Sequence, residues 1–231
     1  KSQKGKRVDQ LHGDLVGDCD LVFTDIVPIS GLDAVFLCLP HGEASTFLKQ
    51  HSFPDATVII DLSTDFRDES AGFVYGLPEV NTKKIKTATR IANPGCFATS
   101  IELALLPLAA KGLLNQDIHV SAITGSTGAG QSLSETSHFS WRNNNVSVYK
   151  TFTHQHLSEI RQTISSVQPA PKIHFIPYRG NFSRGIMANV YTNFAGSQED
   201  AENMFDAFYQ NSPFVFRSSQ PVDVKQVVNT N

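Results

Sequence analysis

Two short, continuous apolar segments place the strongest constraint on the fold of this chain. They cover residues 34–39 (Ala-Val-Phe-Leu-Cys-Leu) and residues 57–61 (Thr-Val-Ile-Ile-Asp). Apolar runs of this length without alternation are typical of strands buried on both faces of a parallel sheet. A helical pattern at residues 42–51 lies between them, residues 63–79 have the polar composition of a loop, and residues 90–92 resemble a third strand. This alternation predicts an α/β domain with a parallel sheet.

The pattern changes after residues 93–95 (Asn-Pro-Gly). Residues 97–111 are rich in Ala and Leu and predict a long helix, which Pro107 is expected to kink or shorten. Further strands are expected at residues 119–123, 172–177 and 186–194, and further helices at residues 156–167 and 201–210. Because these elements do not alternate strictly, we expect an α+β domain with a mixed or antiparallel sheet.

Composition excludes several classes of protein. The chain has 19 Lys+Arg against 22 Asp+Glu, so no basic excess is present to bind a nucleic acid. The longest apolar runs, residues 34–39 and 101–110, are too short to cross a membrane, and Glu102 marks the second as a helix of a soluble protein. Three cysteines without a Cys-x-x-Cys pair predict neither a disulfide framework nor a structural zinc site. They indicate a reducing compartment, and we expect a cytoplasmic protein.

The ends of the chain are unusual for a mature protein. It begins with Lys1 in a polar, basic run over residues 1–7, and no apolar signal segment follows that run. An organelle-targeting remnant is therefore an open alternative. We expect that both ends continue in a longer polypeptide.

Residues 93–96 (Asn-Pro-Gly-Cys) place Cys96 at a tight turn between a strand and a helix. Unpaired N–H groups and the positive end of the helix dipole favour a thiolate, so the sequence predicts a lowered pKa for Cys96. A thiolate at such a turn is a competent nucleophile, and a buried structural cysteine is the alternative. Cys38 is expected in the core, and Cys19, which has acidic neighbours, is a poor nucleophile.

Several short segments together carry a family resemblance. They are residues 39–42 (Leu-Pro-His-Gly), 61–67 (Asp-Leu-Ser-Thr-Asp-Phe-Arg), 75–79 (Tyr-Gly-Leu-Pro-Glu), 93–96, 125–130 (Gly-Ser-Thr-Gly-Ala-Gly), 154–156 (His-Gln-His) and 184–186 (Arg-Gly-Ile). Each segment alone is weakly specific, but their common order is specific. Over essentially its whole length the chain resembles the N-acyl-γ-glutamyl-phosphate reductases of arginine biosynthesis.

The resemblance implies an incomplete Rossmann-like, dinucleotide-binding domain over residues 1–95. A catalytic, substrate-binding and dimerisation domain follows over residues 96–231. The implied activity is an NADPH-dependent reduction of N-acyl-glutamyl phosphate, in which Cys96 forms a thioester, phosphate leaves, and N-acyl-glutamate 5-semialdehyde is released. Covalent capture would hold the acyl group beside the nicotinamide. A homo-dimer or homo-tetramer is also implied.

His154 and His156 are two residues apart, so that both rings can point to one face of an extended segment. The resemblance implies that one of them activates Cys96 and donates a proton later, because imidazole titrates near neutrality. His154 is favoured for this role, and His156 with Glu159 for substrate contact; the reverse assignment stays open. A zinc pair is disfavoured because no third ligand is suitably spaced, and a solvent-facing loop is the other alternative.

Pro40, His41 and Gly42 follow the first predicted strand. Cofactors bind at the carboxyl ends of parallel strands, so we expect these three residues near the nicotinamide or its ribose. The small Gly42 permits close approach of the backbone. An ordinary loop is the alternative.

The glycine-rich segment 125–130 follows a predicted strand, but it is neither a Walker A loop nor a Gly-x-Gly-x-x-Gly fingerprint. The resemblance implies that Ser126 contacts the substrate and that Gly128 and Gly130 contact NADPH/NADP. A plain flexible turn is the alternative. No metal is expected.

Arg184 is expected to bind a carboxylate or phosphate of the substrate through two hydrogen bonds. Arg142 and Arg179 compete with it for this role, and surface salt bridges are the alternative for all three. Asp61 and Arg67 are expected to organise the loop after the second strand.

The sequence departs from the family at both ends. The glycine-rich first strand–turn–helix and the returning C-terminal segment are not found, so cofactor binding by this chain stays open. An aspartate-semialdehyde dehydrogenase-type reductase is a rival with the same cysteine chemistry, but residues 93–96 and 154–156 argue against it. A non-catalytic dimerisation or regulatory fragment is a second rival. The sequence leaves open an acetyl or succinyl group and NADP or NAD.

Overall fold

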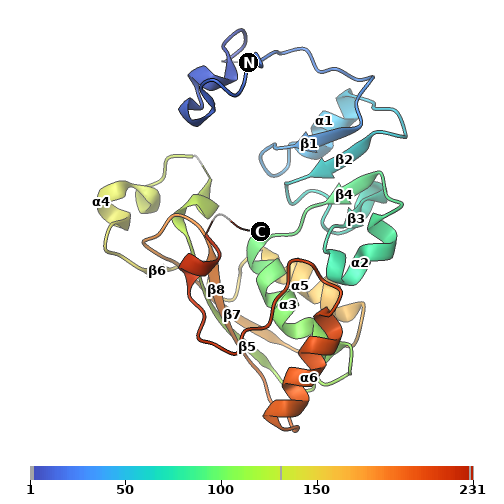
Figure 1. Ribbon diagram of the computed structural model, residues 1–231, viewed down its shortest axis with the longest axis vertical. Helices are drawn as coiled ribbons and strands as arrows, with labels where there is room; N and C mark the ends of the chain where they lie inside the picture. The colour runs from blue at the N-terminus through green and yellow to red at the C-terminus, as the bar shows by residue number, and fades with distance from the viewer. Residues whose placement is uncertain (1–2, 131, 229, 231) are drawn as a thin grey trace.

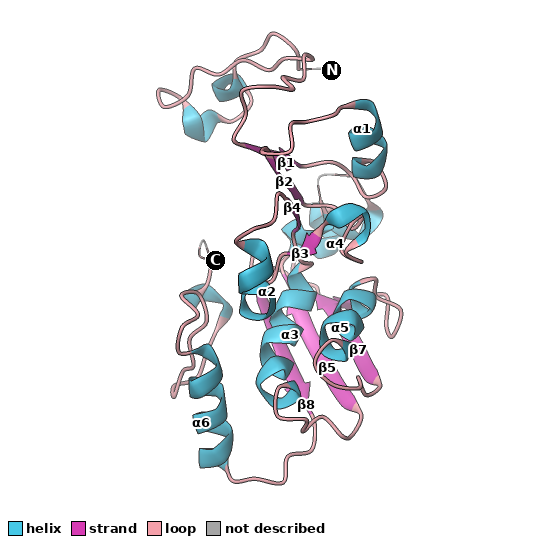
Figure 2. Cartoon of the chain, turned by 90° about the vertical axis from the view of Figure 1, so that its right-hand side faces the viewer, coloured by secondary structure: helices cyan, strands magenta, loops and turns pink. Residues whose placement is uncertain are grey.

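The structure, a computed structural model, describes residues 3–130, 132–228 and 230. It contains two four-stranded sheets, with strand orders β1-β2-β4-β3 and β6-β7-β5-β8 (Figure 1). Part of the basic N-terminal run (residues 1–2) and of the C-terminal segment (residues 229 and 231) lies outside the described residues. The N-terminal 3-10 helices, Val8–Gln10 and Gly13–Leu15, lie apart from both sheets in Figures 1 and 2.

The first sheet is entirely parallel, as the sequence predicts. Its strands are β1 (Ala34–Leu37), β2 (Val58–Asp61), β3 (Val74–Tyr75) and β4 (Arg90–Ala92), and its helices are α1 (Ala44–Gln50) and α2 (Pro78–Ile85). Because all four strands run in one direction, the loops at their carboxyl ends meet at one edge of the sheet. The turn that leads to Cys96 leaves β4 at this edge.

Two expectations for this sheet are wrong. β1 is not buried on both faces: the Phe36 side chain is 61% exposed, and Cys38, expected in the core, is exposed. Among the described residues β1 pairs with β2 alone and forms an edge of the sheet, so its continuous apolar sequence does not correspond to continuous burial. Residues 63–79 are not all loop, since they include β3 and the start of α2; two residues are too few for a strand to leave a pattern in the sequence.

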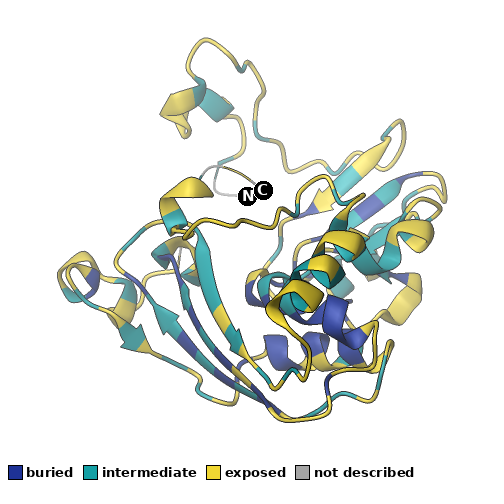
Figure 3. Cartoon of the chain, turned by 60° about the horizontal axis from the view of Figure 1, so that its bottom comes forward, coloured by how far each residue is buried: buried dark blue, intermediate teal, exposed yellow. Residues whose placement is uncertain are grey.

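The second sheet is mixed, which is one of the two arrangements predicted. Its strands are β5 (Ile118–Thr124), β6 (Ser147–Val148), β7 (Ile173–Arg179) and β8 (Ile186–Tyr191). β5 pairs with β7 in parallel, whereas the β5–β8 and β6–β7 pairs are antiparallel. Burial alternates along β5, so that one face of the sheet packs against helices and the other does not (Figure 3).

Helices α3 (Cys96–Ala109) and α5 (His156–Ser165) cover the buried face of this sheet (Figure 2). Phe97, Ile101 and Leu105 of α3 are at most 1% exposed and pack with Ile160 and Phe175 into the main core. α3 ends two residues after Pro107, and Gly112 follows with a φ of +67°. The remaining helices are α4 (Phe139–Arg142) and α6 (Gln198–Tyr209). None of the helices in the described part of the chain is long and apolar enough to span a membrane.

Candidate active site

Cys96 is the first residue of α3 and follows β4 through a turn of three residues. A cavity of about 400 Å³ opens at this point, between the carboxyl edge of the parallel sheet and the mixed sheet. The groups around it come from both sheets and from the start of α5. Those with polar or reactive side chains are His41, Arg67, Cys96, Thr124, Tyr149, Lys150, His154, Gln155, His156 and Arg179.

Gly95 fits closely against the side chains of α5. Its backbone N–H donates a hydrogen bond of 2.9 Å to Glu159 Oε2. A Cβ atom at this position would lie 2.6 Å from both Glu159 Oε1 and His156 Nε2, which is too close for any other residue type. The missing side chain therefore lets the turn before Cys96 contact His156 and Glu159 directly.

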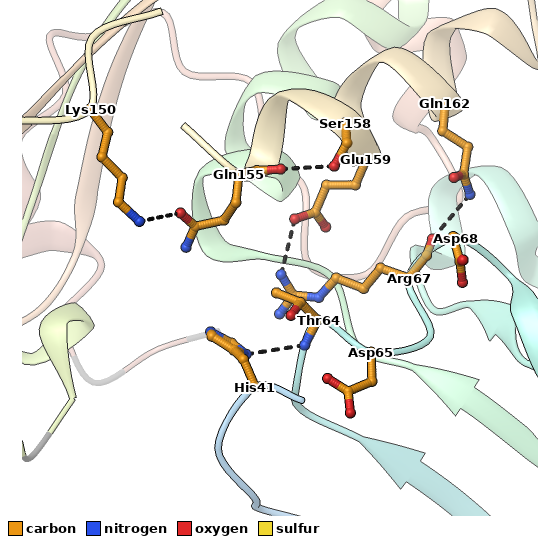
Figure 4. Close-up of a pocket in the computed structure, with 10 residues that line it drawn as sticks. All are labelled: His41, Thr64, Asp65, Arg67, Asp68, Lys150, Gln155, Ser158, Glu159 and Gln162. Atoms are coloured by element: carbon orange, nitrogen blue, oxygen red, sulfur yellow. Dashed lines mark hydrogen bonds and ion pairs between the residues drawn. The ribbon is translucent and has the colours of Figure 1, made fainter. Parts of the chain in front are cut away.

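Glu159 is only 4% exposed, and its carboxylate is held by groups of the protein. Besides Gly95, Arg67 Nη1 donates to Oε1 at 3.0 Å (Figure 4). Tyr75 Oη donates to Oε2 at 2.9 Å. His156 Nε2 lies 3.8 Å from Oε1. The Glu159 carboxylate therefore contacts the turn, Arg67, Tyr75 and the His156 ring; the substrate contact suggested by the sequence stays a prediction.

The two histidines lie together, with ring centroids 4.5 Å apart and planes at 78°. The His156 backbone N–H donates to His154 Nδ1 at 3.2 Å, which leaves the proton of the neutral His154 ring on Nε2. Burial lowers the pKa of His154 to about 4 and that of His156 to about 3. Both rings are therefore neutral at pH 7, and His156 Nδ1 is buried without a hydrogen-bond partner among the described residues.

The lowered pKa predicted for Cys96 is wrong for the free protein. The side chain is exposed to the cavity, but burial of its surroundings raises the pKa of the thiol. Hydrogen bonds from the backbone N–H groups of Cys96 and Phe97 and the charge of Arg67 oppose this effect and are weaker. The free protein thus holds a thiol beside two neutral imidazoles.

Of the three candidate arginines, the structure brings Arg179 to Cys96. Arg179 ends β7, its guanidinium lies 4.7 Å from the Tyr149 ring centroid, and its Nε is buried without a hydrogen-bond partner among the described residues. Arg142 instead donates to backbone carbonyls, among them that of Arg179 at 2.7 Å. Arg184 lies beside Gly125 in a neighbouring turn and does not line the cavity.

Lys150 supplies a second cationic group at the cavity, where its Nζ donates to Gln155 Oε1 at 2.7 Å (Figure 4). Its φ is +43°, in the left-handed region that non-glycine residues rarely occupy. Such backbone conformations persist where the surrounding structure imposes them, often at functional sites.

The residues after β1 form another wall. His41 lines the cavity, and its Nδ1 accepts a hydrogen bond of 3.1 Å from the Thr64 N–H. The Gly42 N–H donates to Asp65 Oδ1 at 2.6 Å, its φ is +89°, and no atom lies within 4 Å of a Cβ built on it. Pro40 is exposed beside them. A second cavity of about 360 Å³ continues from here and shares His41 with the first (Figure 4).

The glycine-rich segment contains a 3-10 helix, Ser126–Ala129, and Gly128 lines the cavity. The Ser126 N–H donates to the Phe182 carbonyl at 2.8 Å, so the segment is tied to the neighbouring turn. Ser126 and Gly130 do not line the cavity. Within the described residues no group of three or more His, Cys, Asp or Glu side chains could hold a metal ion.

Sequence reasoning missed several residues of this region. The sequence predicts only a loop-organising role for Arg67 and makes Arg179 a competitor of Arg184, and Tyr149 and Lys150 follow no recognisable pattern. Glu102, which in the sequence serves only to distinguish its helix from a membrane span, is 0% exposed behind the site. A carboxylate within an otherwise apolar helical segment was the one signal that could have identified it.

Comparisons with known proteins agree with this organisation. Residues 1–88 match the family described as semialdehyde dehydrogenase, NAD binding domain, and residues 96–231 match semialdehyde dehydrogenase, dimerisation domain. An N-acetyl-gamma-glutamyl-phosphate reductase of Christiangramia forsetii is 53% identical over all of this chain and 73% of its own length. A protein of the same name from Flavobacterium johnsoniae is 52% identical over 98% of this chain and 72% of its own length.

Solved structures show the same fold at low identity. Aspartate semialdehyde dehydrogenase II from Vibrio cholerae, complexed with ASA, has a TM-score of 0.70 and 17% identity, over 97% of this chain and 73% of that one. Aspartate semialdehyde dehydrogenase with NADP from Candida albicans has a TM-score of 0.60 and 16% identity, over 81% and 59%. Both similarities concern the fold alone.

Proposed function

Since this chain belongs to the N-acetyl-gamma-glutamyl-phosphate reductase family, we propose that Cys96 carries the acyl group as a thioester during the reaction. The protein is an NADP-dependent oxidoreductase of arginine biosynthesis that reduces N-acyl-L-glutamyl 5-phosphate to N-acyl-L-glutamate 5-semialdehyde and phosphate. One observation carries the proposal: Cys96 begins α3 in a cavity that also holds His154, His156 and Arg179.

The walls of the site fit a nicotinamide cofactor. The loops after β1, β2 and β4 meet at the edge of the parallel sheet where dinucleotides bind. At Gly42 the backbone has open space in front of it, and His41 joins the two cavities. We assign His41, Gly42 and Gly128 to cofactor contact, and Pro40 and Gly130 to the outer margin of the cofactor site. We place the boundary between the two domains at the Gly95–Cys96 peptide.

His156 is the residue we assign to proton transfer with Cys96, because its Nε2 lies against the Gly95 turn and Glu159 can stabilise the imidazolium. The ring accepts the thiol proton as the sulfur attacks the acyl carbon. The bond from that carbon to the phosphate oxygen breaks, and the departing phosphate takes the proton. His154 Nδ1 accepts a hydrogen bond from the His156 N–H and so fixes the backbone of His156.

When bound, NADPH supplies a hydride to the acyl carbon of the thioester. The His156 ring, protonated again from water, donates its proton to the oxygen of the resulting thiohemiacetal. The ring then takes the hydroxyl proton back as the carbon–sulfur bond breaks, and it returns that proton to the Cys96 sulfur. The products are the semialdehyde and the free thiol. One hydride and one proton are consumed, so the cycle balances.

Arg179 and Lys150 are the cations we assign to the acidic substrate. Arg67 is already paired with Glu159, whereas Arg179 lines the cavity and its buried Nε has no hydrogen-bond partner among the described residues. A guanidinium can bind a carboxylate or phosphate through two parallel hydrogen bonds. Ser126 and Arg184 lie near this site, at the turn of residues 182–185. We assign them a secondary role in substrate binding, after Arg179 and Lys150.

A second copy of this chain is the partner we propose for the open face of the mixed sheet. That face carries an apolar hollow of about 310 Å³, lined in part by Phe152, Ile176 and Tyr191. Such a hollow on a sheet face suits an interface between subunits. We propose a homo-dimer or homo-tetramer in a reducing compartment such as the cytoplasm, because the reaction needs Cys96 as a free thiol.

The reaction can be run backwards to test the function. We expect NADP⁺ to be reduced to NADPH in the presence of N-acetyl-glutamate 5-semialdehyde and phosphate, and this activity to be lost in the Cys96→Ala variant. Turnover only with an N-succinyl analogue would keep the mechanism and change the acyl group. Turnover with aspartate semialdehyde alone, or activity that survives Cys96→Ala, would contradict the proposal.

A further inference from the structure

A second buried carboxylate lies behind the site. Glu102 occupies the second turn of α3, and its side chain is 0% exposed. The groups that interact with it come from three other parts of the chain: Tyr75 on β3, Glu159 and the Thr163 hydroxyl on α5, and Arg67 from the loop after β2. None of the steps described above uses Glu102.

The hydrogen bonds at Tyr75 require an additional proton. Tyr75 Oη lies 3.2 Å and 3.1 Å from the two carboxylate oxygens of Glu102, and 2.9 Å from Glu159 Oε2. A phenol has a single proton to donate, whereas an ionised carboxylate only accepts. If Tyr75 donates to Glu159, the nearer acceptor, then Glu102 can form its contact only by donating a proton of its own to Tyr75 Oη.

The charges of the cluster lead to the same conclusion. Arg67 Nη1 lies 3.0 Å from Glu159 and neutralises it. A second ionised carboxylate at Glu102 would have no cation of its own, and a buried unpaired charge is strongly unfavourable. Burial, reinforced by the charge of Glu159, raises the pKa of Glu102 to about 8.

We propose that Glu102 is a positioning residue that keeps its proton in the working enzyme. The chain of hydrogen bonds Glu102–Tyr75–Glu159 then holds the Gly95 N–H and the His156 ring in place beside Cys96. A neutral Glu102 leaves Glu159, already paired with Arg67, as the one anion of the cluster and the carboxylate beside the His156 ring. An ionised Glu102 would be a second anionic acceptor for the Tyr75 hydroxyl. It would compete with Glu159 and weaken the hydrogen bond between Tyr75 and Glu159.

The Glu102→Gln variant tests this directly, because a glutamine amide has the shape of the protonated carboxyl and also donates a hydrogen bond. We expect kcat of the wild type to decline as pH rises through the pKa of Glu102. Glu102→Gln should keep kcat/KM at pH 7 and lose this decline. Glu102→Leu should lower kcat more than it changes KM. Glu199→Gln, on the exposed surface of α6, is the matched control and should follow the wild-type profile.

Infrared spectroscopy gives a readout that does not depend on activity. The wild type at pH 7 should show a carboxylic-acid C=O band that shifts in heavy water, and this band should be missing from Glu102→Gln. An absent band in the wild type, or a Glu102→Gln variant as impaired as Glu102→Leu at pH 7, would overturn the inference. The kinetic part of this test rests on the proposed function. A band that appears as expected in a protein without reductase activity would leave Glu102 protonated and contradict the proposed function alone.

Discussion

The Gly95 N–H and Glu159 Oε2 lie 2.9 Å apart although 64 residues separate them along the chain. This hydrogen bond fastens the turn before the cysteine to the first turn of α5. Because Arg67 holds the other oxygen of the same carboxylate, the parallel sheet, the Cys96 turn and the histidine pair meet at one buried group. Glu159 therefore aligns residues that the chain supplies from three different places.

Gly95→Ala should abolish most activity. The new Cβ would lie 2.6 Å from Glu159 Oε1 and His156 Nε2, so the turn and the histidine must separate. Overpacking of this kind costs about 1–3 kcal/mol of stability, which urea denaturation measures alongside kcat. Gly13→Ala, with no atom within 4 Å of its Cβ, is the control and should behave as wild type. An active Gly95→Ala enzyme would show that the close contact is dispensable.

Arg67→Leu should destabilise the protein strongly. The substitution leaves Glu159 buried and unpaired, and breaking a buried ion pair in this way costs about 3–5 kcal/mol. Lys4→Leu removes one partner of the exposed Lys4–Asp25 pair, at 2.8 Å, and should change the unfolding free energy far less. Equal effects of the two substitutions in urea titrations would mean that the Arg67–Glu159 pair does not hold the two sheets together.

Acid should destabilise the fold through the histidine pair. The pKa of His154 is about 4 and that of His156 about 3 in the folded state, whereas an unfolded histidine titrates near ~6.5. Between these pH values the unfolded chain binds more protons than the folded chain. The contribution of the histidine pair to the unfolding free energy is therefore complete above pH ~6.5 and is lost as the pH drops toward 4. Urea midpoints measured across this range should show the loss. His154→Gln should make the dependence shallower; an unchanged slope would refute the assignment.

Alkylation of Cys96 in the free protein should be slow at neutral pH. Because burial raises the pKa of the thiol, the thiolate fraction increases only as the pH rises beyond the ordinary thiol range. Mass spectrometry of the Cys96 peptide after iodoacetamide treatment at a series of pH values measures this rate. A rate that already levels off below pH 7 would instead reveal a thiolate–imidazolium pair in the resting enzyme.

Arg179→Gln should raise KM for the acyl substrate by tenfold or more, since a hydrogen bond to a charged group contributes about 1.5–3 kcal/mol. Arg161→Gln, an exposed change on α5, serves as the control with the same change of charge. Initial rates with varied substrate separate KM from kcat. A larger increase in KM from Arg184→Gln than from Arg179→Gln would show that the substrate anion binds at Arg184, in the turn at residues 182–185, and not at Arg179.

The sequence was informative where chemistry is local. The parallel sheet followed from apolar segments and alternating helices, and the family followed from short segments such as 93–96 and 154–156. Contacts between distant residues left no such trace. Tyr75, Glu102 and Glu159 meet only after three elements pack together, so nothing in their spacing predicts this chain of hydrogen bonds. The predicted pKa of Cys96 failed for a related reason: the helix terminus is visible in sequence, but the removal of water around it is not.

The exposed face of β1 shows a further limit of pattern reading. Residues 34–39 are uniformly apolar, yet Phe36 is exposed in the described structure because one face of an edge strand is uncovered. A run of apolar residues reports what a strand is able to bury. It does not report which neighbours are present to bury it.

Trapping the acyl-enzyme tests the central claim most directly. The protein is mixed with N-acyl-glutamyl phosphate without NADPH, quenched in acid and digested. The mass of the Cys96 peptide is then measured by mass spectrometry. We predict a mass increase equal to one N-acyl-glutamyl group on Cys96, which disappears when NADPH is added before the quench and never forms in Cys96→Ala. An unmodified Cys96 peptide in a protein that still turns over the acyl phosphate would contradict the thioester account.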